Sequence, residues 1–183
     1  MGISVFVSVP QAHLSKQHAF INRLYSHLAD RGLEHPTLGV TDYDTNAPLT
    51  AVRRMLIESN GLIAVAFRRV HVTAAVLRDG ADMAHRQALP MGEFWLTSPW
   101  CQIETAMAFQ LGLPILILRE RGVLADGILE KGVTGLYLPE FDLDDPGRDL
   151  FASPEGRQLL SEWEGYVRHV VRIKGLPPQL YFY

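Results

Sequence analysis

The sequence predicts an α/β fold, a single three-layer domain with a central, mostly parallel five-stranded sheet. Strand-like apolar segments alternate with helical patterns about five times along the 183 residues, which is typical of parallel strands joined by crossover helices. Two of these segments, "GLIAVAF" at 61–67 and "LPILIL" at 113–118, are almost entirely apolar. Central strands that are covered on both faces read in this way. We expect one domain over residues 1–183.

The first strand and the first helix have clear boundaries. "ISVFVSVP" at 3–10 is rich in β-branched residues, and Pro10 ends it. The segment 15–32 has apolar side chains at four-residue spacing, with Ser15 as a candidate N-cap and Gly32 as a left-handed stop. A strand followed by an amphipathic helix is therefore predicted at the N-terminus.

The next elements repeat the pattern. A short strand is expected at the start of "HPTLGVTDYD" (35–44), which runs into a polar loop. A helix is expected in "PLTAVRRMLIESNG" (48–61), where three apolar side chains share a face: Leu49, Val52 and Leu56. The apolar strand at 61–67 follows directly.

The segment 68–97 interrupts the alternation because it shows no clean period. A connection of that length in a compact domain is usually functional, or contains elements that the sequence pattern does not reveal. We predict an insertion here, with a short helix around 81–88. Both of its ends border the expected site, so we interpret it as a mobile lid with a buried anchor around Phe94 and Trp95.

A helix is predicted from Ser98, the N-cap, and Pro99 to Gly112. Its apolar residues suggest a core stripe made of Trp100, Ile103, Met107 and Leu111. Glu104 flanks that stripe, four residues after Trp100. A carboxylate there is costly to bury without a partner. It would suit the edge of a pocket, and a plain structural pairing with an arginine is an equally good interpretation.

The last third of the chain completes the fold. A short helix is expected at 122–132 and a fifth strand in "TGLYLPEF" at 134–141. A closing helix at about 153–175 has an inner apolar face of four residues: Leu159, Trp163, Val167 and Val170.

Two motifs carry a resemblance to known families. "SPWCQIETAMA" at 98–108 resembles the Ser-x-Trp-Cys-x-x-Glu helix of TIR (Toll/interleukin-1 receptor) domains, and 3–10 resembles their first strand. In NAD-cleaving members that Glu is catalytic. The same stretch resembles nucleoside 2-deoxyribosyltransferases, whose catalytic Glu starts a Glu-x-x-x-Ala-x-x-x-Gly-x-Pro pattern. The residues that fit it are Glu104, Ala108, Gly112 and Pro114.

The resemblance covers roughly residues 3–141 and departs from TIR domains in the segment 68–97 and in the closing helix. It implies a flavodoxin-like, TIR-like fold in which Glu104 is the catalytic carboxylate. Such folds bind ligands beyond the carboxyl ends of the strands, where the strand order reverses. Further substrate-binding candidates at that edge are Ser8, Asp42, Tyr43, Phe67, Arg68, Trp95, Ser98 and Trp100.

Each of these candidates has a structural alternative. Arg68 follows the central strand and would bind a diphosphate bidentately, but a solvated basic loop explains it as well. Asp42 and Tyr43 would contact ribose or base, or belong to a turn before the helix. Trp95 and Trp100 would stack on a base, although the place of Trp100 on the stripe favours the core.

Composition narrows the function classes. The net charge of −3 gives no reason to expect nucleic-acid or membrane binding. No signal peptide and no apolar run of membrane-spanning length is recognised, so a cytoplasmic location is expected. A single cysteine, Cys101, builds neither a disulfide framework nor a cysteine metal site. The histidines show no metal-ligand spacing, and His13 is interpreted as a surface residue.

The sequence therefore predicts an enzyme that cleaves NAD at the nicotinamide–ribose bond, with NAD as substrate and with no cofactor or metal. The resemblance further implies a bacterial antiviral defence component, a homo-oligomer and a possible partner defence protein. Two alternatives remain open at this point. One is a deoxyribosyltransferase-like enzyme acting on nucleosides or nucleotides. The other is a non-catalytic nucleotide-sensing or protein-interaction module.

Overall fold

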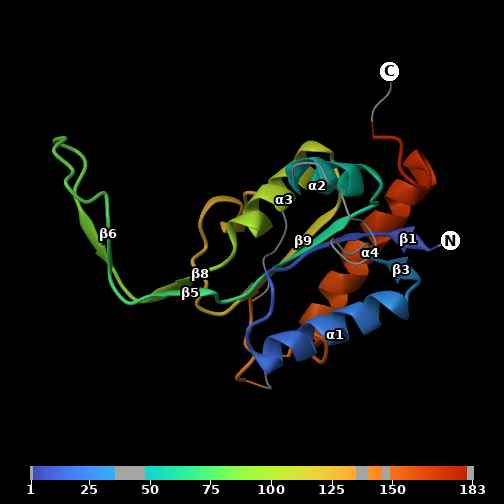
Figure 1. Ribbon diagram of the computed structural model, residues 1–183, viewed down its shortest axis with the longest axis horizontal. Coiled ribbons are helices and arrows are strands. Elements are labelled where there is room, and N and C mark those ends of the chain that lie inside the picture. The colour runs from blue at the N-terminus through green and yellow to red at the C-terminus, as the bar shows by residue number, and fades with distance from the viewer. Residues whose placement is uncertain (1, 36–47, 135–139, 146–148, 181–183) are drawn as a thin grey trace.

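The computed structural model describes residues 2–35, 48–134, 140–145 and 149–180. A parallel sheet runs through its centre in the order β10-β9-β4-β2. Its strands are β2 (Phe6–Ser8), β4 (Leu62–Ala66), β9 (Ile115–Glu120) and β10 (Glu140–Phe141). One residue before β2, β1 (Ile3–Ser4) pairs in parallel with β3 (Leu33–Glu34). β1 and β2 thus act as one strand that extends the sheet to five positions, and the predicted α/β class is confirmed (Figure 1).

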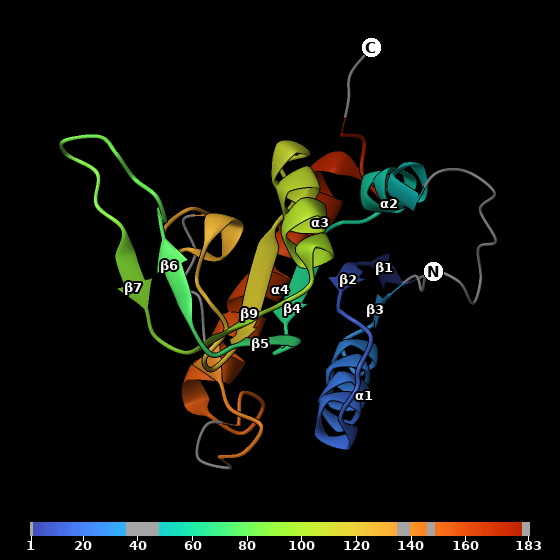
Figure 2. The same ribbon diagram turned by 60° about the vertical axis from the view of Figure 1, so that its left-hand side comes forward.

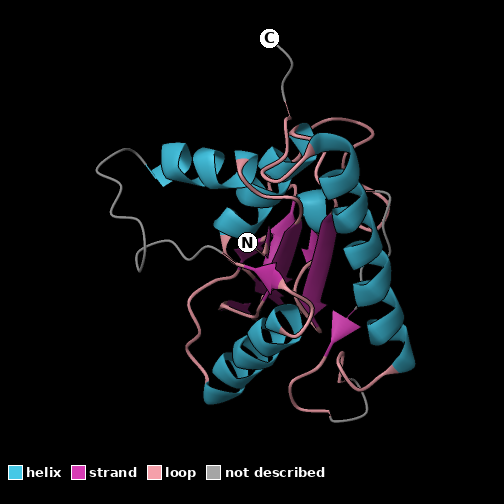
Figure 3. Cartoon of the chain, turned by 90° about the vertical axis from the view of Figure 1, so that its right-hand side faces the viewer, coloured by secondary structure: helices cyan, strands magenta, loops and turns pink. Residues whose placement is uncertain are grey.

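Helices cover both faces of this sheet, as Figure 3 shows. α1 (Ser15–Ala29) and α4 (Pro154–Lys174) contribute to one buried cluster, and α2 (Pro48–Ile57) and α3 (Pro99–Gln110) contribute to the other. All five residues of β4 are buried, and they alternate between the two clusters. Ile63 and Val65 belong to the first, whereas Leu62, Ala64 and Ala66 belong to the second. This two-residue alternation explains why the central strand reads as a continuous apolar run.

The insertion at 68–97 forms a β arm. β5 (Val70–Val72) pairs antiparallel with β8 (Phe94–Leu96), and β6 (Ala75–Leu77) pairs antiparallel with β7 (Leu89–Met91). Figures 1 and 2 show the arm projecting away from the body of the molecule. Residues 81–88 are all described and contain no helix, so the helix predicted there is wrong. The chain instead reverses through two left-handed residues, Arg78 and Gly80.

The arm is attached to the body of the molecule near Phe94 and Trp95, where a buried anchor was predicted. Phe94 and Trp95 are half-buried, and Trp95 packs against the cluster that contains α2 and α3. Its backbone N–H donates to Gly122 and its carbonyl accepts from Leu124, at 2.9 and 2.8 Å. In the remainder of the arm, six of the eight large apolar side chains are exposed to solvent. The exposed ones are Val70, Val76, Leu77, Met83, Leu89 and Leu96.

Several smaller expectations differ from the structure. α1 is preceded by Leu14 as N-cap, with Ser15 inside the helix. Leu49 is exposed at the start of α2, while Val52 and Leu56 are buried as predicted. In place of a helix over 122–132, a single 3₁₀ turn, η1, spans Gly127–Leu129. Of the fifth predicted strand, Thr134 lies in a bend, residues 135–139 lie outside the described residues, and Glu140–Phe141 form β10.

Candidate active site

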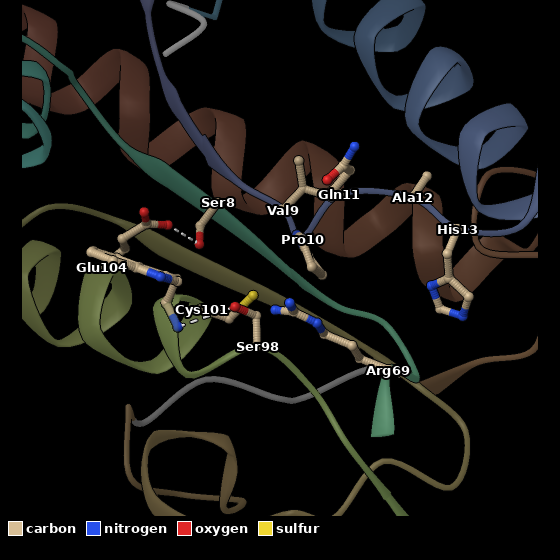
Figure 4. A pocket seen from close by; sticks show the side chains of 11 residues that line it. Ser8, Val9, Pro10, Gln11, Ala12, His13, Arg69, Ser98, Cys101 and Glu104 are labelled. Atoms are coloured by element: carbon tan, nitrogen blue, oxygen red, sulfur yellow. Dashed lines mark hydrogen bonds between the residues drawn. The ribbon is translucent and has the colours of Figure 1, made fainter. Parts of the chain in front are cut away.

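A cavity of about 580 Å³ opens where β2 and β4 end, beside the first turn of α3. Its walls come from the end of β2 and the loop that follows it, from Arg69 beyond the end of β4, and from the N-terminal half of α3 with its N-cap. The residues that line it are Ser8, Val9, Pro10, Gln11, Ala12, His13, Arg69, Ser98, Trp100, Cys101 and Glu104 (Figure 4). It lies at the carboxyl edge of the sheet, between β2 and β4. There the strand order reverses, because the chain adds β3 on one side of the first strand and β4 on the other.

Glu104 lies on the buried face of α3 and is only 8% exposed. The hydroxyl of Ser8, at the end of β2, donates a hydrogen bond to Oε2 of Glu104 (Figure 4). Burial raises the pKa of the Glu104 carboxyl, and the Ser8 hydrogen bond lowers it by a smaller amount. The cavity thus holds a poorly solvated carboxylate that one hydroxyl orients.

The start of α3 is fixed by the residues that the sequence suggested. Ser98 is the N-cap, and its Oγ accepts a hydrogen bond from the N–H of Trp100 at 3.3 Å. Pro99 occupies the first helical position. Ser98 is 2% exposed and lines the cavity, so the N-terminus of α3 begins at the cavity wall.

The predicted core stripe of α3 is wrong at its first two residues, whereas Met107 and Leu111 are partly buried and pack against the core. Trp100 and Ile103 are 41% and 40% exposed. The side chains that are buried are Cys101, Glu104, Thr105 and Ala108. α3 is apolar on nearly every side, so apolar spacing does not identify its inner face. The face with small side chains packs on the sheet because it allows the helix to approach β4 closely, and Glu104 turns inward with it.

Cys101 lines the cavity beside Glu104 but is held as a neutral thiol. Burial raises its pKa to about 11, and the nearby Glu104 charge adds to the shift. Its sulfur lies 3.5 Å from the carbonyl oxygen of Val65, to which the thiol donates. A thiol with so high a pKa is a poor nucleophile at neutral pH.

The cation in the cavity is Arg69, and the predicted Arg68 is directed elsewhere. Arg68 Nε donates to the carbonyl of Arg121 at 2.6 Å and lies 3.9 Å from Glu120. Arg69 extends along the cavity wall toward Ser98 and Cys101 (Figure 4). No side-chain ion pair or hydrogen bond of Arg69 is formed within the described part of the chain. Successive residues leaving β4 point to opposite sides, so only one of the two arginines reaches the cavity.

The structure brings together four of the predicted site residues: Ser8, Ser98, Trp100 and Glu104. Phe67 is 1% exposed in the core, where it packs edge-on against Phe20 and Phe141. Trp95 stacks on His71 at the base of the arm, with ring centroids 4.3 Å apart. Neither lines the cavity. Asp42 and Tyr43 lie outside the described residues.

The loop at 9–13 forms part of the cavity wall, as its place after the first strand predicts, although the sequence analysis singled out neither its side chains nor Arg69 as substrate-binding candidates. His13, interpreted as a surface residue, is exposed and lines the cavity. The position of this loop directly after the first strand was the available signal, because loops at the carboxyl edge of a parallel sheet form its ligand sites. The arm contributes Arg69 alone to the cavity lining, so in this structure it does not act as a lid.

Among the described residues, no group of three or more His, Cys, Asp or Glu side chains is arranged to hold a metal ion. Within the same residues, no helix is both long enough and apolar enough to span a membrane.

No known family profile matches the chain, and no curated protein matches it. Among solved structures, a Clostridium botulinum CMP N-glycosidase, BcmB, is 15% identical with a TM-score of 0.47. The match covers 87% of this chain and 98% of that one. The TIR domains of the activated Roq1 resistosome, which recognises the pathogen effector XopQ, are 12% identical with a TM-score of 0.40. That match covers 95% of this chain and 86% of the other. Identities and TM-scores this low do not establish a family for this chain.

Proposed function

We propose that the protein is an N-glycosidase that cleaves NAD at the nicotinamide–ribose bond. The observation that carries the proposal is the buried Glu104 carboxylate, oriented by Ser8 on the wall of a cavity large enough for part of a nucleotide. A poorly solvated carboxylate in such a place can stabilise the positive charge that develops on the sugar of a bound substrate during bond cleavage.

NAD suits a site with one carboxylate. Its nicotinamide is already cationic, so the bond between ribose C1′ and the ring nitrogen breaks with both electrons going to the nicotinamide. No general acid is needed for that step. Glu104 opposes the charge left on C1′ until water adds its oxygen there and releases a proton, which gives ADP-ribose and nicotinamide. The same carboxylate would also serve base exchange or cyclisation, in which another nucleophile replaces the water.

Arg69 supports a substrate that carries phosphate. Its guanidinium lies on the cavity wall and forms no ion pair with the described residues. Guanidinium groups bind phosphate oxygens bidentately. The exposed ring of Trp100 on the same wall offers a stacking surface for a base. A plain nucleoside would leave Arg69 without a function.

The proposal is tested by incubating the purified protein with NAD and separating the products by chromatography. Glu104→Gln keeps the shape of the side chain and removes its charge, so we expect at least a thousandfold loss of cleavage, or about 4 kcal/mol. Glu130→Gln, which removes an exposed carboxylate at the end of η1, is the matched control and should leave the rate unchanged. Near-normal turnover by a folded Glu104→Gln protein would refute the proposal.

The assay is repeated over a range of protein concentrations, because we also propose that the chain forms a homo-oligomer. Large apolar side chains on α2, α3 and the arm are exposed, and such patches are typical of interaction surfaces.

Cleavage of deoxynucleosides but not of NAD would favour a deoxyribosyltransferase-like enzyme. Nucleotide binding without cleavage at any concentration would favour a sensing module.

A further inference from the structure

Two polar side chains are buried behind the cavity and do not line it. Gln17, in the first turn of α1, is 0% exposed, and Glu120, the last residue of β9, is 1% exposed. Burial of such groups is costly unless their hydrogen bonds are made within the protein. Their partners therefore show what the two residues hold in place.

The Gln17 amide joins two walls of the cavity. Its Oε1 accepts hydrogen bonds from the N–H groups of His13 and Leu14, at 3.1 and 3.3 Å. Its Nε2 donates to the carbonyl of Arg68 at 3.2 Å. The first pair of bonds holds the end of the loop after β2, and the last bond holds the segment that carries Arg69.

Glu120 fixes the other side of the same segment. Its Oε2 accepts a hydrogen bond from the N–H of Arg68 at 2.7 Å. Both backbone polar groups of Arg68 are thus bonded to buried side chains. The next N–H, that of Arg69, donates to the carbonyl of Leu96 at 2.9 Å. With three consecutive backbone groups fixed, the direction in which Arg69 leaves the chain is set.

The sheet does not provide this link. β2 pairs with β4 as far as Ser8 and Ala64 and then ends. Beyond that point, no backbone–backbone hydrogen bond joins residues 9–14 to residues 67–69 in the described structure. Gln17 bridges the opening where the two strands separate. Only a side chain with both a donor and an acceptor can do so, which excludes leucine, methionine and an ionised glutamate.

We propose that Gln17 is a positioning residue that holds Arg69 at the spacing from the Ser8–Glu104 pair that a diphosphate-containing substrate requires. It acts through the backbone of Arg68, with Glu120 fixing the other side of that residue. The proposal rests on the function proposed above and extends it, because it assigns the preference for a dinucleotide over a nucleoside to a side chain that never touches the substrate.

The test is a double-mutant cycle between Gln17→Met and Arg69→Ala. Two substrates with the same scissile bond are compared, NAD and nicotinamide riboside, which lacks phosphate. ADP binding is measured separately by calorimetry. We expect Gln17→Met to raise KM for NAD and Kd for ADP about tenfold, with less than a twofold change in kcat/KM for the riboside. In the Arg69→Ala background, Gln17→Met should have no further effect on NAD or ADP.

Two further variants separate positioning from folding. Gln17→Asn keeps the amide but shortens the side chain by one methylene, so it cannot reach both walls and should reproduce the selective loss if Gln17→Met fails to fold. Gln158→Met changes an exposed glutamine on α4 and should have no effect. Equal losses on both substrates, additive effects in the cycle, or no ADP binding by the unaltered protein would overturn the inference. If neither substrate is cleaved, the function proposed above fails, and the ADP titrations still decide the role of Gln17.

Discussion

Glu104 must be ionised to oppose a developing positive charge, yet burial raises its pKa. The active form is therefore lost as the pH falls through that raised value. We predict a pH profile of kcat/KM for NAD whose acid limb has its midpoint above 4.5, the ordinary value for a glutamate. Rates measured from pH 4 to pH 8 check this expectation.

Removal of the Ser8 hydroxyl should move the same limb. Ser8 donates to Glu104 and lowers its pKa, so Ser8→Ala should shift the midpoint to higher pH. Ser4→Ala, at the opposite end of the same strand, is the control and should leave the profile in place. An unchanged midpoint in Ser8→Ala would show that the hydroxyl does not stabilise the charged carboxylate.

The same raised pKa predicts a conflict between activity and stability. A carboxyl whose pKa is higher in the folded state stabilises the fold at low pH, and that contribution is lost as pH rises through the folded pKa. Glu104→Gln never ionises, so its free energy of unfolding should exceed that of the unaltered protein at pH 8. The difference should disappear near pH 4. Urea denaturation at the two pH values measures it, and a less stable Glu104→Gln protein at pH 8 would contradict it.

At the scale of elements, two serine N-caps offer a matched comparison. Ser98 caps α3 at the cavity, and Ser153 caps α4, where its Oγ accepts from the N–H of Gly156 at 3.0 Å. We expect Ser98→Ala and Ser153→Ala each to cost about 1 kcal/mol of folding stability. Only Ser98→Ala should also reduce NAD cleavage, because α3 carries Glu104. Equal loss of activity in both variants would mean that stability alone controls the rate.

The β arm is expected to be dispensable for the body of the fold. Val72 pairs with Phe94 at the inner end of the arm, so Asn-Gly in place of residues 74–92 would close β5 and β8 into a short hairpin. The free energy of unfolding should change by less than about 1 kcal/mol, because the removed side chains are mostly exposed. Chemical denaturation tests this, and a much larger loss would show that the arm packs on the body.

At the scale of the whole molecule, the packing of α4 depends on Gly61, the residue just before β4. A Cβ on Gly61 would lie 2.6 Å from Cγ2 of Val167 and 3.3 Å from the Trp163 ring. Gly61→Ala should therefore cost about 1–3 kcal/mol by overpacking. Val167→Ala removes the clashing methyl, so the double variant should be more stable than the sum of the two single changes predicts. Additive losses would place the strain elsewhere.

The sequence allowed the sheet and the catalytic candidate to be predicted for physical reasons. Parallel strands covered on both faces are continuous apolar runs, and an acidic residue in an apolar helix is costly enough to stand out. The inner face of α3 was not predictable, because exposed Trp100 and Ile103 hide the period. The choice between Arg68 and Arg69 depends on how the chain turns after β4. The β arm was not predicted, because its apolar side chains suggested a buried anchor or a lid, whereas most of them are exposed in the structure.

The contact between Ser8 and Glu104 joins residues 96 positions apart in the chain. Loop closure over such a distance is entropically costly and slow, and it must wait until β2 and β4 have paired and α3 has docked on the sheet. We therefore expect the Ser8–Glu104 pair to be among the last features to assemble during folding. In a refolding reaction, recovery of NAD cleavage should lag behind recovery of helical circular dichroism, and the lag measures how long the protein exists as a folded scaffold without a working site.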